Sequence, residues 1–265
     1  MNCTATPIAL PGILDLRAQF LQENNFQIRY DSVHRRGWST SWLITLDGTP
    51  IGYGSTMGQE KREVHDTIFE FYILPTHLHR AFLAFETLLA ASKAIYVETQ
   101  SNLTLLPTML FTYIRDIVSH VTLFSAGPTT NLQPVNTVFG ADPSTQPQPP
   151  GTALFRPWRD GDKAFDHTSE PTGDFVLAVN EEIVATGGFL LHYNAPFADL
   201  YMEVKPEHRQ KGLGSYLIQE LKRECYAAGR VPAARCNNVN TASRATLLKG
   251  GMTIAGNMLL GKINP

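Results

Sequence analysis

Cysteine and charge are both scarce in this sequence. The chain of 265 residues has three cysteines, Cys3, Cys225 and Cys236, whose number and spacing suit neither a disulfide framework nor a cysteine-ligated metal. Charged residues make up 17% of the chain and its formal net charge is −2, which gives no reason to expect general attraction to nucleic acids or membranes. These shortages predict reduced thiols, no metal site, no nucleic-acid partner and no membrane partner.

Long apolar runs are also absent. None approaches the roughly 20 residues that a helix needs to cross a bilayer. The N-terminus lacks the basic segment and long apolar stretch of a secretory signal. We therefore expect a cytoplasmic protein.

The sequence is rich in proline, glycine, threonine and glutamine from about Ala126 to Gly151, which is typical of a linker between domains. We therefore predict an N-terminal domain over residues 1–127, a linker over 128–151 and a C-terminal domain over 152–265. The length of the chain suits one large or two modest domains.

The two halves resemble each other. Each contains a predicted β-hairpin, with turns at residues 47–48 and 180–182, followed by an apolar strand that ends at Pro75 or Pro206. This similarity predicts a tandem repeat. A single C-terminal domain preceded by an unrelated domain remains the alternative.

After Pro206 comes a basic loop with two glycines, and then a helical pattern with an apolar stripe at Leu213, Leu217, Leu221 and Cys225. Such a turn directs backbone N–H groups and the positive end of a helix outward, which suits a diphosphate. When Pro75 is aligned with Pro206, the first half has no equivalent loop. The residues that replace Arg209, Gly212 and Gly214 are Leu78, Ala81 and Leu83.

The pattern Arg209-x-x-Gly212-x-Gly214 resembles the acyl-CoA pyrophosphate loop of GNAT-type N-acetyltransferases. The segment from Asn240 to Met252 resembles the N-x-x-A/S helix of that family, which K-x-G-F closes. The resemblance implies an α+β (mixed α/β) fold with two tandem GNAT-like domains, each a central, mostly antiparallel twisted sheet flanked by helices. The first domain is expected to be degenerate and the second catalytic.

The resemblance also implies acetyl-CoA as cosubstrate and no metal. The residues expected to contact acetyl-CoA are Val204, Arg209, Gln210, Lys211, Gly212, Leu213, Gly214, Ser215, Asn240 and Ser243. Asn240 is equally well explained as a helix cap. The charges of Arg209 and Lys211 are otherwise those of an ordinary solvated loop.

Acetyl transfer to an amine needs a base, a group that polarises the thioester and an acid for the leaving thiolate. Strand alternation puts Tyr201 and Glu203 on one face, so Glu203 is the first candidate base, with His192 and Asp199 behind it. An ion-paired Glu203 is the equal alternative. The family's usual tyrosine acid falls on Leu247. Either another group such as Tyr201 or Tyr193 takes that role, or the thiolate leaves unassisted.

The expected activity is therefore direct transfer of an acetyl group to an amine whose identity the sequence does not reveal. The alternative is a non-catalytic acyl-CoA-binding regulatory module, as the missing tyrosine suggests. Either a monomer or a homodimer is expected.

Overall fold

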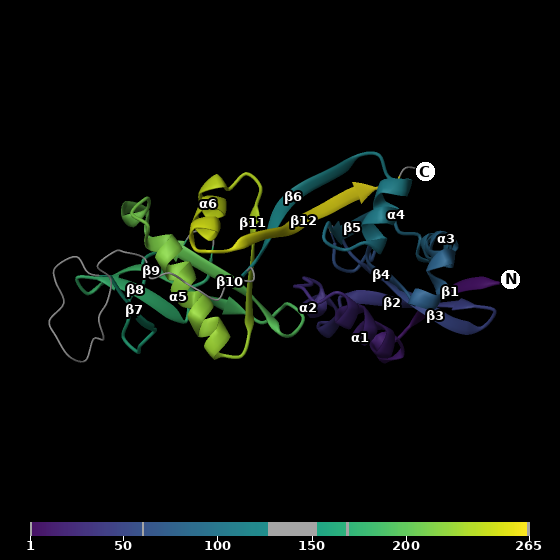
Figure 1. The fold of residues 1–265 in the computed structure, drawn as a ribbon, viewed down its shortest axis with the longest axis horizontal. Coiled ribbons are helices and arrows are strands. Elements are labelled where there is room, and N and C mark those ends of the chain that lie inside the picture. The colour runs from purple at the N-terminus through teal and green to yellow at the C-terminus, as the bar shows by residue number, and fades with distance from the viewer. Residues whose placement is uncertain (1, 60, 127–152, 168–169, 264–265) are drawn as a thin grey trace. The chain divides into compact units, whose positions relative to one another are not determined.

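The computed structural model describes residues 2–59, 61–126, 153–167 and 170–263, so the predicted linker over 128–151 lies outside the described residues. The chain forms two compact units (Figure 1). The first unit comprises Met1–Thr122 and Gly256–Pro265, and the second comprises Leu123–Ala255.

The first unit contains a sheet with the strand order β1-β2-β3-β4-β5-β12. Neighbours from β1 to β4 are antiparallel, β4 and β5 are parallel, and β5 and β12 are antiparallel. The strands are β1 (Cys3–Ile8), β2 (Ser39–Leu46), β3 (Thr49–Met57), β4 (Thr67–Ile73), β5 (Tyr96–Gln100) and β12 (Thr253–Lys262). The helices are α1 (Leu14–Glu23), α2 (Asp31–Arg35), α3 (Ala81–Ser92) and α4 (Leu105–Tyr113).

The second unit repeats this plan with the strand order β6-β11-β10-β9-β8-β7. Its strands are β6 (Ile117–Ser125), β7 (Ala153–Pro157), β8 (Phe175–Val179), β9 (Glu182–Leu190), β10 (Phe197–Val204) and β11 (Val231–Asn237), and its helices are α5 (Leu213–Ala227) and α6 (Thr241–Lys249). Strands β7 to β10 pair antiparallel, and β10 and β11 are parallel. The predicted mixed α/β fold with two similar, mostly antiparallel domains is confirmed.

The units depart from the expected domain ranges at one strand each. Strand β6 follows α4 in the chain, yet its last residues belong to the second unit. Strand β12 follows α6, yet Met258 to Lys262 pair with β5 of the first unit. Because the halves are repeats, β6 and β12 are equivalent strands and each fits the place beside the fifth strand of the other half. The sequence prediction had assumed that each half keeps all of its own strands.

The predicted hairpin turns are present. Asp47 and Gly48 have φ of 48° and 84°, and Asn180 and Glu181 have φ of 49° and 69°. Two consecutive residues with positive φ are characteristic of the type I′ turn, whose twist matches that of the flanking strands. The turns set the registers that join β2 to β3 and β8 to β9.

Helix α5 packs on the sheet of the second unit through the predicted apolar stripe, and all four stripe residues lie in its buried core. The helix lies close to the strands. A methyl group at Gly187 of β9 would lie 2.8 Å from Cδ1 of Leu221 and 2.9 Å from Cβ of Met202. One face of this sheet is therefore occupied by α5, and Tyr201 and Glu203 belong to the opposite face.

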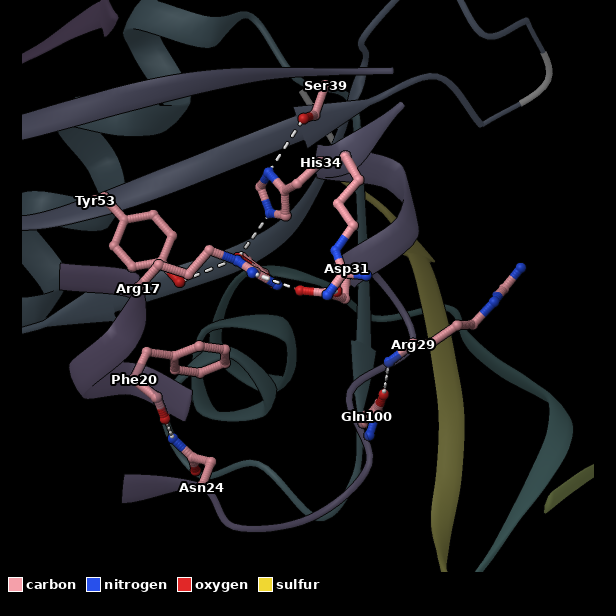
Figure 2. Close-up of polar contacts among 11 residues, drawn as sticks. Arg17, Phe20, Asn24, Arg29, Asp31, His34, Ser39, Tyr53 and Gln100 are labelled. Atoms are coloured by element: carbon pink, nitrogen blue, oxygen red, sulfur yellow. Dashed lines mark hydrogen bonds and ion pairs between the residues drawn. The ribbon is translucent and has the colours of Figure 1, made fainter. Parts of the chain in front are cut away.

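The first unit buries a cluster of charged residues where β4 and β5 separate. The two strands pair only at Thr67↔Tyr96 and Ile68↔Val97. Beyond these pairs, Arg17 of α1 donates two hydrogen bonds to Glu70, at 3.0 and 3.1 Å, and one of 2.9 Å to Asp31. Figure 2 shows Arg17, Asp31, His34 and Tyr53 meeting at this place.

Glu70 is the centre of this cluster. His34 Nε2 lies 2.9 Å from Glu70 Oε2, and the Tyr53 hydroxyl donates to the same oxygen at 3.0 Å. Burial opposes ionisation of the carboxyl, but Arg17 and His34 outweigh burial and hold the pKa of Glu70 well below its usual range. The cluster is therefore a buried ion network whose charges compensate one another.

Candidate functional site

The loop between β10 and α5 has the backbone shape that the glycine pattern predicts. After Val204 the chain makes a short 3₁₀ turn, Pro206–His208, and α5 begins at Leu213. Gln210 and Gly212 both have positive φ, at 62° and 81°. Alternation of left-handed and other conformations turns successive N–H groups toward one side, which forms a concave anion site.

The N–H groups of this loop are available. Among the described residues, no acceptor is recorded for the backbone N–H groups from Gln210 to Gly214, whereas those of His208 and Arg209 bond to Lys205 and Pro206. These groups lie at the N-terminus of α5, a helix of 15 residues whose dipole favours an anion there. The loop therefore has both the geometry and the polarity for a diphosphate.

Glycine is required at the two loop positions for different physical reasons. Gly212 needs its positive φ, and a side chain there would meet nothing within 4 Å, so it would extend into the open space in front of the loop. A methyl group at Gly214 would lie 3.0 Å from Thr246 of α6 and 3.1 Å from Met202 of β10. Gly214 thus allows α5 to approach its neighbours, so a substitution there would disturb packing. A substitution of Gly212 would affect ligand binding without disturbing that packing.

The cationic side chains of the loop all have protein partners. Arg209 Nε donates to the Val204 carbonyl at 2.9 Å, and Arg209 Nη2 lies 3.5 Å from Oε1 of Glu203. Lys211 donates to the Glu207 carbonyl at 3.0 Å, and Lys205 is paired with Glu182. Arg209 therefore joins the loop to the end of β10 and leaves half of its side chain exposed.

Strands β10 and β11 separate beside this loop. Their parallel pairing covers three positions, Phe197↔Val231 to Asp199↔Ala233. No β11 partner is recorded for Leu200 to Val204 in the part of the chain that the structure describes. The free edge of β10 runs from this separation to the glycine loop, so an extended chain whose diphosphate lies at the loop can pair along it.

The structure places the three candidate catalytic residues at different points. Glu203 is buried beside the loop, where it accepts the N–H of Glu170 at 3.2 Å and lies close to Arg209. Tyr201 lies across Gly188, where a methyl group would be 2.8 Å from the tyrosine hydroxyl. His192 lies at the other end of β10, with Nε2 3.0 Å from Asp199 Oδ2. Only Glu203 adjoins the glycine loop.

The surroundings of Tyr201 favour a protonated hydroxyl. Burial, with the negative charges of Asp174 and Glu170, raises the pKa of Tyr201. The Tyr201 hydroxyl is therefore protonated at neutral pH.

On helix α6, Asn240 is a helix cap, because its side-chain oxygen accepts the Ser243 N–H at 2.9 Å. Leu247 is buried in the core of the second unit, and its aliphatic side chain has no acidic proton to donate. Sequence reasoning gave little weight to Asp199 and missed Arg235, whose Nε lies 3.3 Å from Asp199 Oδ2. Little in the sequence indicated Arg235, since a single arginine in a strand is not part of a recognisable motif.

The described residues contain no group of three His, Cys, Asp or Glu side chains placed to hold a metal. Among the same residues, no helix is long and apolar enough to cross a membrane.

Residues 139–251, which include the glycine loop, match the model of the Acetyltransferase (GNAT) family. No curated protein matches the sequence. The match covers the half in which the strand separation and the free N–H groups lie, and it supports acyl-CoA-dependent acetyl transfer in general.

Solved structures share the fold over the whole chain. A GNAT-family acetyltransferase from Colwellia psychrerythraea aligns with a TM-score of 0.68 at 10% identity, covering 98% of this chain and 100% of that one. A GCN5-related N-acetyltransferase from Sphaerobacter thermophilus gives 0.54 at 14% identity, with coverages of 99% and 96%. A tandem GNAT protein from the clavulanic acid biosynthesis pathway gives 0.55 at 12%, with coverages of 100% and 99%. The chain therefore has the fold of tandem GNAT proteins over its whole length, and its second half contains the segment that matches the GNAT family model.

Proposed function

We propose that the protein is an acetyl-CoA-dependent N-acetyltransferase whose single cosubstrate site lies in the second unit. The observation that carries the proposal is the run of N–H groups from Gln210 to Gly214 that have no acceptor within the described ranges, at the start of α5 and beside the separated strands. In this proposal the loop from Arg209 to Ser215 binds the diphosphate, and the free edge of β10 down to Val204 binds the pantetheine. Acetyl-CoA supplies the activated acetyl group.

The reaction turns one ammonium and one thioester into one amide, one thiol and one proton. The protein must remove a proton from the ammonium so that the nitrogen can form the new N–C bond. As the C–S bond breaks, Tyr201 donates its proton to the sulfur, because its hydroxyl lies on the same face of β10 as Glu203 and is protonated. On α6, Asn240 and Ser243 lie at the helix start, where they are proposed to contact the pantetheine through backbone groups.

The test uses Gly212→Asn. Asparagine tolerates the positive φ of this position, but its side chain fills the space that the diphosphate would take. We expect the Kd for CoA to rise about 10- to 100-fold, on the scale of one charge-assisted hydrogen bond. Isothermal titration calorimetry with CoA measures this effect.

The matched control is Gly229→Asn. Gly229 also has positive φ and open space around it, but it follows the other end of α5. The control should bind CoA like the unaltered protein. If a folded Gly212→Asn protein binds CoA with the same affinity as the unaltered protein, the proposed site is wrong. If the site binds CoA but no amine is acetylated, the protein is instead a non-catalytic acyl-CoA-binding module.

A second prediction concerns stoichiometry: one CoA should bind per chain. In the first unit, a 3₁₀ turn over Pro75–Arg80 leads directly into α3, and no residue there has positive φ. The His77 N–H is already bonded to Leu74 at 2.8 Å. Titration should give one site per chain, and two equivalent sites would contradict the prediction.

A further inference from the structure

The position of Asp199 suggests which part of the site receives the acceptor. The argument rests on the proposed function. A pantetheine arm is about as long as four to five residues of extended chain. When its diphosphate end lies at the loop after Val204 and it follows β10 backward, about 3.3 Å per residue, its sulfur comes beside Asp199. Asp199 is also the last residue of β10 that pairs with β11.

Asp199 carries an unusual buried carboxylate. The residue is 5% exposed. Its Oδ2 has two neighbours, His192 Nε2 at 3.0 Å and Arg235 Nε at 3.3 Å. Its Oδ1 is buried and has no hydrogen-bond partner among the described residues. A buried carboxylate oxygen without a donor is costly, and such exceptions in native proteins call for an explanation.

Three carboxylates, Asp199, Glu203 and Glu170, interact near this face of β10, with Arg235 beside Asp199 and Arg209 beside Glu203. Asp199, Tyr201 and Glu203 alternate along one face of β10, opposite the face covered by α5. Burial and the carboxylates of Asp199 and Glu203 raise the pKa of Glu170, against the opposing charge of Arg235. Carboxylates gathered in a partly buried place attract cations and repel anions.

We propose that Asp199 Oδ1 binds the ammonium group of the acceptor, and that the acceptor is a small amine without a carboxylate. Asp199 is then a specificity-determining residue at the thioester end of the site. His192 and Arg235 lie beside its other oxygen, at 3.0 and 3.3 Å. Glu203 lies at the diphosphate end of the same face and is not the group that meets the amine.

The first experiment uses the unaltered full chain with acetyl-CoA and three amines of equal length. They are 1,4-diaminobutane, 1-aminobutane and 4-aminobutanoate, which have four carbons each and carry a positive charge, no charge and a negative charge at the far end. We expect kcat/KM to be at least about 10-fold higher for the first two than for 4-aminobutanoate, because the carboxylate is repelled. Equal values, preference for 4-aminobutanoate, or no acetylation of any of the three would overturn the inference.

The second experiment uses Asp199→Asn, which keeps the shape and removes the charge. We expect the KM for the amine to rise about 10- to 100-fold while the Kd for CoA stays the same, since the lost contact is one hydrogen bond to a charged group. Glu203→Gln should raise this KM less. Asp160→Asn, which alters an exposed carboxylate after β7, is the control and should change neither constant.

The outcomes separate the inference from the function on which it rests. If the unaltered protein does not bind CoA, the proposed function is wrong. Acetylation with an unchanged amine KM in Asp199→Asn would overturn only the inference. If Asp199→Asn does not fold, as circular dichroism would show, the charge ranking of the three amines decides.

Discussion

Replacement of Glu70 by glutamine is expected to lower the free energy of unfolding by about 3–5 kcal/mol. Glu70 is fully buried and compensates the charge of Arg17, whose other anionic partner among the described residues is Asp31. Without the Glu70 carboxylate, Arg17 and His34 keep their place in a region from which water is excluded. Removal of one member of a buried ion network costs much more than loss of a surface pair.

Urea denaturation, followed by fluorescence and circular dichroism, measures this effect. The matched control is Glu86→Gln, since Glu86 is a carboxylate of the same unit that accepts one exposed hydrogen bond, from Tyr113 at 2.7 Å. The control should cost less than about 1 kcal/mol. A Glu70→Gln protein as stable as the control would show that the cluster contributes little to the fold.

The same pair of proteins gives a pH test. Because the folded-state pKa of Glu70 lies below its usual value of 4.5, the carboxylate stabilises the fold above that value. This contribution is lost as the pH falls toward the folded-state pKa. The stability difference between the unaltered protein and Glu70→Gln should therefore be largest above about pH 5 and shrink in more acidic solution.

Local patterns predicted much of the fold. The hairpins follow from turns at Asp47-Gly48 and Asn180-Glu181, where the required φ values limit the choice of residue. The loop before α5 follows from Gly212, because positive φ there also depends on a single residue. Features set by one or two residues can be read from a sequence without knowledge of the tertiary structure.

Features that depend on distant residues could not be predicted. The sequence alone does not show that Arg209 reaches Glu203, or that Gly214 faces Thr246. Strict alternation puts Ile68 and Phe71 on opposite faces of β4, yet both lie in one core. A register shift between β3 and β4 at Ser55/Thr56 reverses the alternation. Bulges of this kind depend on the partner strand.

The exchange of β6 and β12 could not be predicted from the sequence either. The two halves are repeats in which β6 and β12 are the last strands, so the order of elements does not show which sheet each strand joins. Pattern alone cannot decide between equivalent partners. The family resemblance helped with the loop and not with this exchange, because both motifs lie in the second half and before β12.

A fragment of residues 141–265 is expected to aggregate or remain unfolded, although it contains the whole predicted catalytic domain. The second unit uses residues that precede the cut. Phe124 of β6 is fully buried in the core of this unit, and β6 is the neighbour of β11. Loss of a buried phenylalanine alone costs about 3–5 kcal/mol, comparable with the whole stability of a domain. The fragment would also expose the edge of β11, which favours aggregation.

The control keeps every residue and cuts the chain. With a protease site inserted after residue 140, cleavage leaves Phe124 in the core and β6 beside β11, so both pieces should stay together and CoA affinity should be retained. Size-exclusion chromatography and calorimetry compare the cut protein with the fragment. A monodisperse 141–265 fragment with full CoA affinity would show that the second unit does not need β6. The opposite pair of results, a failed fragment and a functional cut protein, would show that the exchanged strand, rather than the continuity of the chain, makes the first half indispensable.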